Sequence, residues 1–232
     1  MNLGLKRRVA GMLSLMLVLC LTGEATFAQK QSKSANEATR RTQDAATVFN
    51  EIMGAPDKGI PKDLMNKAQA VAVFPGVLKA AFIFGGREGK GVISRRTATG
   101  WSTPAFFTLG GGSFGAQIGA DKTDYVLLIM NDKGLNGLLS DKFEIGGDVG
   151  VAAGPVGREA SAATDAELRA DILTYSRSKG VFAGVSLSGT SIAPDNKLNE
   201  AVYGMTARDV LSGSASSVNS GGSAFTQTLA RY

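Results

Sequence analysis

The chain has 232 residues, no histidine and a single cysteine, Cys20. These absences exclude a Ser-His-Asp triad, a cysteine nucleophile paired with histidine and an ordinary zinc site, whereas carboxylate, Ser-Lys and magnesium chemistry stay open. The formal net charge of +5 is far below that of a dense basic nucleic-acid-binding surface, so we expect no nucleic-acid partner. Because the residue types of common catalytic sites are missing, we expect, on balance, a non-catalytic protein without metal or cofactor.

The first 28 residues have the pattern of an export signal. A basic start at residues 6–8 precedes an apolar run, 9–21, that is too short to span a bilayer. Small residues then lead to Ala28, after which we expect cleavage by a signal peptidase. Lipidation of Cys20 is disfavoured because Leu19 stands where a small residue is usual. We therefore expect an exported chain that is periplasmic or associated with the cell envelope.

Two helices are predicted at the start of the mature chain. A capping-box pattern at residues 34–37 precedes apolar residues at helical spacing, including Phe49 and Ile52, and Gly54 ends the element. Pro61 opens a second, shorter helix.

Glycine dominates the middle of the chain, with 21 glycines in the 114 residues from Gly76 to Gly189. Short apolar runs between them predict a largely antiparallel sheet that closes into a barrel-like body. We expect a hairpin turn near Gly85–Gly89, and a central strand at Tyr125–Met130, which is apolar on both faces. The runs are Val71–Phe74, Ala80–Phe84, Gly91–Arg95, Ala105–Leu109, Ala116–Ala120, Tyr125–Met130, Phe143–Val151, Ile172–Ser176 and Val181–Leu187.

Further elements follow towards the C-terminus. Residues Asp132–Leu139 predict one or two helical turns and Asn196–Tyr203 a helix, whereas Thr164–Ser176 fits helix or strand. Ser212–Ser223 is rich in serine and glycine and predicts a flexible tail. The predicted fold class is α+β, with N-terminal helices packed against a glycine-rich, mostly antiparallel, barrel-like sheet. The domains are a signal peptide (1–28), one domain (29–205) and a C-terminal helix with the tail (206–232).

Two motifs suggest chemistry and are better explained by structure. Residues Gly110–Gly115 match the dinucleotide fingerprint GxGxxG, but Ala116–Ala120 alternates like a strand where the fingerprint requires a helix. Glu144 and Asp148 lie on the outer side of one predicted strand, about 13 Å apart. Glycosidase carboxylates are roughly 5–10 Å apart, so a solvated face is the better interpretation.

Basic residues gather around the predicted hairpin and on the two N-terminal helices. For any one of them, an ordinary solvated surface is the simplest interpretation. Together, beside an amphipathic helix, they could form a face for anionic lipid headgroups. The candidate lipid-binding residues are Arg40, Arg41, Lys62, Lys67, Lys79, Arg87, Lys90, Arg95 and Arg96.

Several segments, in order from about Asn36 to Gly204, resemble the SYLF domain family, which includes the yeast actin-binding SH3 proteins. The most distinctive is Tyr175–Leu187, with the sequence YSRSKGVFAGVSL. The other matching segments are Ala70–Gly76, Gly89–Val92, Gly100–Ala105, Leu109–Gly119, Asp124–Asn131 and Gly146–Gly157.

The resemblance implies a single compact domain of helices and strands that binds lipid without catalysis. Eukaryotic members bind phosphoinositides, some yeast members bind actin filaments, and an N-terminal amphipathic helix, matched here by residues 34–53, contributes to membrane contact. The present chain differs in its export signal and in lacking an SH3 or FYVE module. An exported, bacterial-type member would meet envelope phospholipids, so the expected partner is an anionic phospholipid surface. The alternative is an envelope structural or protein-interaction module that binds envelope proteins and no lipid.

Overall fold

The computed structural model describes residues 29, 31–55, 59–81, 85–113, 119–140, 143–147, 149–157, 169–178, 180–185, 187, 189–213 and 223–232. The predicted signal peptide, 1–28, lies outside the described residues. The chain divides into two units, Met1–Glu37 and Ala38–Tyr232, and the architecture below is that of the second.

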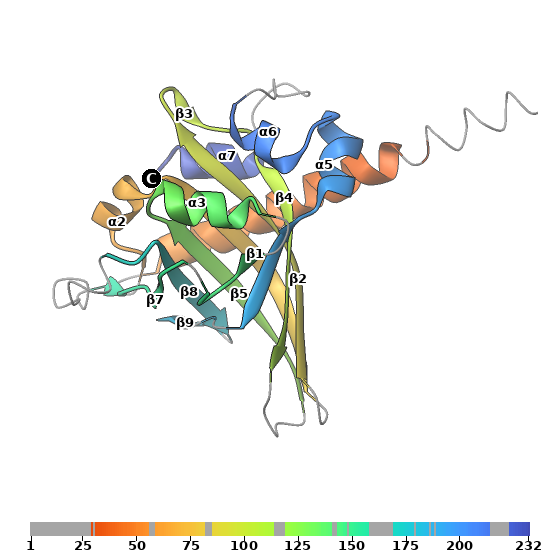
Figure 1. Cartoon of the computed structure of the whole chain (residues 1–232). Helices are drawn as coiled ribbons and strands as arrows, with labels where there is room; N and C mark the ends of the chain where they lie inside the picture. The colour runs from red at the N-terminus through yellow and green to blue at the C-terminus, as the bar shows by residue number, and fades with distance from the viewer. Residues whose placement is uncertain are drawn as a thin grey trace, which may run out of the picture. The chain divides into compact units, whose positions relative to one another are not determined.

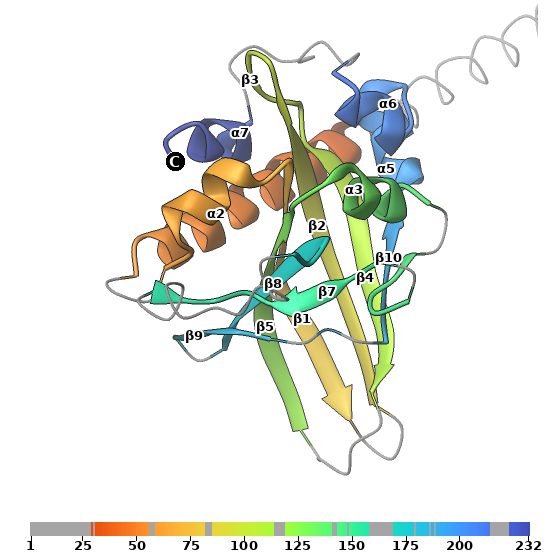
Figure 2. The same cartoon turned by 60° about the vertical axis from the view of Figure 1, so that its left-hand side comes forward.

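A ten-stranded sheet forms the centre of this unit (Figures 1 and 2). The strand order is β6-β10-β4-β2-β1-β5-β8-β7, with β3 paired to β2 and β9 to β8. All pairings are antiparallel except β7 with β8. The strands are β1 (Ala70–Ala81), β2 (Gly85–Thr97), β3 (Gly100–Trp101), β4 (Ala105–Ser113), β5 (Gly119–Ile129), β6 (Phe143–Glu144), β7 (Val151–Ala153), β8 (Ile172–Ser178), β9 (Val181–Gly184) and β10 (Thr190–Pro194).

Helices cover the sheet. They are the part of the N-terminal helix in this unit, residues 38–53, and α2 (Lys62–Lys67), α3 (Asp132–Leu138), α5 (Asn196–Tyr203), α6 (Ala207–Leu211) and α7 (Ala224–Leu229). The N-terminal helix and α7 pack on one face, here called the helix face, whereas α3 and α6 pack on the opposite face. The predicted α+β class is confirmed, with a curled, mostly antiparallel sheet and N-terminal helices packed against it.

Strand alternation builds a core on each face. In β5, Val126 and Leu128 point to the helix face, and Leu127 and Ile129 to the opposite face, and all four are fully buried. Burial on both faces explains why Tyr125–Met130 is continuously apolar. Since β5 lies between β1 and β8, its prediction as a central strand is confirmed.

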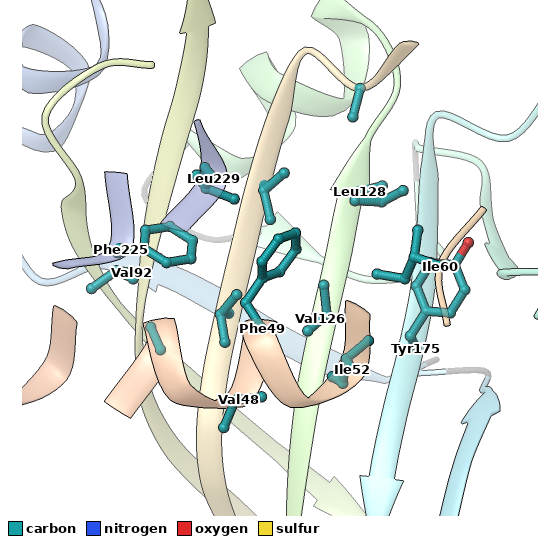
Figure 3. Close-up of a cluster of buried hydrophobic side chains, with 14 of the residues drawn as sticks. Val48, Phe49, Ile52, Ile60, Val92, Val126, Leu128, Tyr175, Phe225 and Leu229 are labelled. Atoms are coloured by element: carbon teal, nitrogen blue, oxygen red, sulfur yellow. The ribbon is translucent and has the colours of Figure 1, made fainter. Parts of the chain in front are cut away.

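The apolar stripe of the N-terminal helix belongs to the helix-face core (Figure 3). Phe49 and Ile52 are fully buried. The Phe49 ring meets Phe225 of α7 edge-on, with 6.4 Å between the ring centroids, and Tyr232 at 5.8 Å. The segment after residue 205 therefore contributes side chains to the same core as the helix.

Several sequence predictions of elements are confirmed and two are wrong. Helices occur at Asp132–Leu138 and Asn196–Tyr203, and the ambiguous segment ends in strand β8. Residues 164–168, the first part of that segment, lie outside the described residues, as do residues 214–222 of the predicted tail. Among the described residues, no helix has the length and apolarity to cross a bilayer.

The first wrong prediction is the hairpin turn at Gly85–Gly89. These residues form the start of β2, where Gly85–Glu88 pair with β1, so they are not the turn. The runs Val71–Phe74 and Ala80–Phe84 were expected as separate strands, but all of the first and Ala80–Ala81 of the second lie in β1, which continues through an irregularity after Phe74. Residues 82–84 lie outside the described residues. Glycine also occurs inside strands, where a side chain of the neighbouring strand occupies the space that a Cβ would take. The glycines of this segment therefore did not mark the turn.

The second is the single strand at Phe143–Val151. Only Phe143–Glu144 and Val151–Ala153 are strands, because the chain turns between them at Gly146, whose φ is 93°. Phe143, Ile145 and Val149 are nevertheless buried and Glu144 is exposed, as expected for a residue on the outer side of the predicted strand.

Candidate functional site

The glycine motif that matches a nucleotide fingerprint is part of the sheet. Residues Gly110–Ser113 belong to β4, where Gly111 pairs with Arg87 of β2 on one side and Thr190 of β10 on the other. Phe114 and Gly115 lie outside the described residues, and the next described element is strand β5. The backbone groups of this stretch are engaged in strand pairing and are not arranged around a helix N-terminus to hold a phosphate.

The candidate carboxylate pair is not assembled in the described structure. Glu144 is exposed on β6, and Asp148 lies outside the described residues. Within the described part of the chain, no three Asp, Glu, His or Cys side chains gather closely enough to hold a metal ion.

The far ends of β1, β2, β4 and β5 extend away from the helices in both views (Figures 1 and 2). We call residues 77–81, 85–90, 110–113 and 119–123 the distal strand end. Its charged side chains are four cations and two carboxylates: Lys79, Arg87, Lys90, Lys122, Glu88 and Asp121. This end of the sheet therefore carries net positive charge.

A hollow of about 280 Å³ opens on the helix face beside the distal strand end. Arg40 and Asp44 line it from the N-terminal helix, and Glu88 and Lys90 line it from β2. Leu78 of β1 adds an apolar side chain that is 44% exposed. The structure thus brings together three predicted site residues, Arg40, Arg41 and Lys90, with the carboxylates Asp44 and Glu88 in the same lining.

Lys79 and Arg87 point to the opposite face. They pair across β1 and β2, and each is one residue along its strand from a residue that lines the hollow, Leu78 and Glu88. Because successive side chains alternate between faces, they cannot share the surface of Arg40 and Lys90. Arg87 donates a hydrogen bond to the Thr190 hydroxyl at 3.1 Å.

Two predicted site residues hold the fold together. Arg41 is 5% exposed and forms an ion pair of 2.9 Å with Asp195, the N-cap of α5. Arg96 donates to the carbonyl oxygens of Met65 and Ala68, which closes the end of α2, and its guanidinium lies 4.3 Å from the Trp101 ring centroid. Such charged hydrogen bonds and ring contacts stabilise packing.

The other three lie away from the distal strand end. Lys62 and Lys67 are exposed on α2. Arg95 is within ion-pair distance of Asp132 at the start of α3, at 3.8 Å. The nine candidates therefore form several separate groups rather than one basic face.

A partly exposed ion network, which the sequence did not reveal, lies at the base of the distal strand end. Asp124 accepts two hydrogen bonds from Arg177 and one from the amide of Gly76, at 2.7 Å. Arg177 also pairs with Glu51 of the N-terminal helix. Burial lowers the pKa of Arg177, but the hydrogen bonds and charges of Asp124 and Glu51 outweigh it and raise that pKa. The network joins the helix, β5 and β8 at the irregularity in β1.

Sequence reasoning also missed Lys122. It precedes the apolar core of β5 in the polar run Asp121–Asp124, and it pairs in register with Leu78. Strand alternation counted back from Val126 would have placed it on the helix face.

Comparison with known proteins identifies the family. Residues 110–232 match the family model Ysc84, described as "Las17-binding protein actin regulator". The chain is 38% identical over 170 residues to "LAS seventeen-binding protein 3" of Saccharomyces cerevisiae, covering 71% of this chain and 37% of that protein. It is 33% identical over 171 residues to "SH3 domain-containing YSC84-like protein 1" of Homo sapiens, covering 71% and 50%. The chain thus matches between about a third and half of the length of these relatives. The resemblance to the SYLF domain is confirmed, and the chain belongs to the Ysc84 family.

Proposed function

We propose that this protein is a non-catalytic module that binds an anionic membrane surface through the distal strand end. The observation that carries the proposal is the distribution of cations at that end. Lys90 and Lys122 lie on the helix face, and Lys79 and Arg87 on the opposite face. Cations on both faces of a sheet can reach one layer of headgroups together only if the end of the sheet meets the membrane. The contact is therefore end-on.

Membrane attraction by this end is electrostatic. A Lys or Arg near an anionic surface contributes about 1 kcal/mol, and the attraction fades within a Debye length of about 8 Å at physiological salt. Glu88 and Asp121 reduce the net charge to +2, which favours reversible, salt-sensitive binding over permanent attachment. Export directed by residues 1–28 would make an envelope phospholipid the ligand.

The N-terminal helix is a poor candidate for insertion into the bilayer. Its stripe of Val48, Phe49 and Ile52 is buried in the helix-face core, and Arg41 and Glu51 tie it to α5 and β8 (Figure 3). Insertion would expose the apolar surface that these residues cover on β1 and β5. The resemblance to the family led us to expect that this helix contributes to membrane contact. In our proposal the distal strand end makes the membrane contact instead, because the helix is packed in the core.

A charge-neutralising variant tests the proposal. Lys79, Arg87, Lys90 and Lys122 are changed together to glutamine, and co-sedimentation with phosphatidylglycerol-containing vesicles is measured at low salt. We expect binding to fall at least tenfold, since about 1 kcal/mol is lost at each position. Binding of the unchanged protein should also weaken as salt rises.

The matched control removes the same charge elsewhere. Glutamine replaces Lys62, Lys67, Lys133 and Lys197, which are exposed on α2, α3 and α5. We expect vesicle binding within about twofold of the unchanged protein, because these cations lie outside the proposed contact. The proposal would be wrong if the unchanged protein did not bind vesicles at low salt, or if both variants lost vesicle binding equally.

A second candidate function is a protein-interaction module without lipid binding. It is favoured by relatives whose printed names describe Las17 binding and by the mixed charges of the hollow around exposed Leu78. This function predicts that the protein binds purified protein partners, and that a Leu78→Ser variant binds them more weakly. Las17 and actin filaments are the first partners to test. Neither the unchanged protein nor the Leu78→Ser variant would then bind vesicles.

A further inference from the structure

A row of side chains crosses five strands on the face opposite the N-terminal helix. Residues in register across neighbouring strands point to the same face. In strand order the row consists of Asp121 in β5, Lys79 in β1, Arg87 in β2, Gly111 in β4 and Thr190 in β10. Two cations therefore stand directly beside each other at the centre of the row, which we call the cation row.

Like charges in direct cross-strand register repel each other, so this pair does not serve strand pairing. Lys79 is half-buried, and its side chain makes no hydrogen bond or ion pair with any other described residue. Asp121, on its other side, accepts hydrogen bonds from the Ser178 hydroxyl at 3.1 Å and the Lys122 amide at 3.0 Å. No described carboxylate therefore pairs with the ammonium group of Lys79, which leaves its charge available to an anionic partner.

Arg87 is held in place but is not fully satisfied. Gly111 has no side chain between β2 and β10, so the guanidinium reaches across it to the hydroxyl of Thr190, which is 1% exposed. The Nε atom of Arg87 is buried, and no described residue accepts its hydrogen bond. A buried donor without an acceptor is costly, and an incoming oxygen atom would relieve that cost after a small rotation of the side chain.

We propose that Lys79 and Arg87, with Thr190 as the anchor of Arg87, bind a single oxyanion of the phosphate class. The planar guanidinium suits two oxygen atoms of one phosphate, and the lysine adds a point charge beside it. The phosphate can belong to a lipid headgroup or be free in solution. For the headgroup source the inference rests on the proposed membrane function, and for free phosphate it stands alone.

The test begins with calorimetric titration of inorganic phosphate into the purified protein. A Lys79→Gln/Arg87→Gln variant is expected to bind phosphate at least tenfold more weakly, and Thr190→Val roughly threefold more weakly because Arg87 loses its anchor. The matched control, Lys62→Gln/Lys67→Gln, removes equal charge from α2 and should bind phosphate within about twofold of the unchanged protein. Circular dichroism melting confirms that each variant is folded.

Vesicles of phosphatidylcholine with about one third phosphatidylglycerol identify the source of the phosphate. If inorganic phosphate displaces these vesicles from the unchanged protein, at constant ionic strength, the site takes the headgroup. If phosphate binds at the cation row without displacing them, the ligand is free phosphate.

Equal loss of phosphate binding in the two double variants, or no phosphate binding by the unchanged protein, overturns the inference. In either case, vesicle binding by the unchanged protein would leave the proposed membrane function standing. Vesicle binding that fails while phosphate binding at the cation row persists would overturn only the membrane function.

Discussion

The Gly91→Ala variant is expected to be less stable than the unchanged protein by about 3 kcal/mol, the upper end of the usual range for overpacking. A Cβ at this position in β2 would overlap the Phe74 ring and the Val73 carbonyl oxygen of β1. The carbonyl belongs to the backbone of a paired strand and Phe74 is fully buried, so neither can move freely. The measurement is chemical denaturation followed by circular dichroism.

The same strand supplies the control. Gly86 is also in β2, but a Cβ there would meet nothing within 4 Å. Gly86→Ala should therefore change the free energy of unfolding by no more than about 0.5 kcal/mol. If the two variants had the same stability, the close approach of β1 and β2 at Gly91 would be wrong. The contrast also separates a glycine needed for packing from one that is not.

The Phe49→Ala variant is expected to lose about 3–5 kcal/mol of unfolding free energy. Phe49 is fully buried, and its removal leaves a cavity beside Phe225 and Tyr232. For a chain of this length, each kcal/mol lowers the melting temperature by roughly 2–4 °C. Thermal melting of the variant and the unchanged protein measures the effect.

Thr47→Ala is the matched control, because Thr47 is exposed on the same helix. Its stability should stay close to that of the unchanged protein. A helix whose apolar stripe inserted into lipid instead of the core would give a different result. Phe49→Ala would then melt normally and bind vesicles more weakly, which would contradict the packing described above.

The sequence predicts the apolar elements of this fold well because their periodicity reflects burial directly. The helix through Phe49 and the central strand at Tyr125–Met130 are both found in the core. Glycine was harder to interpret, since it marks turns and close strand approaches alike. Gly146 has a positive φ in a turn, whereas Gly91 lies inside a strand where Phe74 needs the space.

The candidate site was predicted less well, because the role of a cation depends on partners that are distant in sequence. Arg41 binds Asp195, 154 residues away, and Arg87 binds Thr190, 103 residues away. Neither contact follows from local pattern. Of the basic residues near the predicted hairpin, Lys79 and Arg87 are cross-strand neighbours, whereas Arg95 and Arg96 contact α3 and α2. The division of the basic residues between two faces required the register of β1 and β2, which an irregularity after Phe74 shifts.

The unusual length of β2 sets a stand-off distance in an end-on complex. From Arg87 to Arg96 the strand advances nine residues, or about 30 Å at roughly 3.3 Å per residue. Arg96 is bonded to the end of α2, so α2 would be held at about that height above the headgroups. This height exceeds three Debye lengths at physiological salt, so a partner captured there would be out of electrostatic reach of the lipid. The sheet would then act as a rigid spacer between the headgroups and α2.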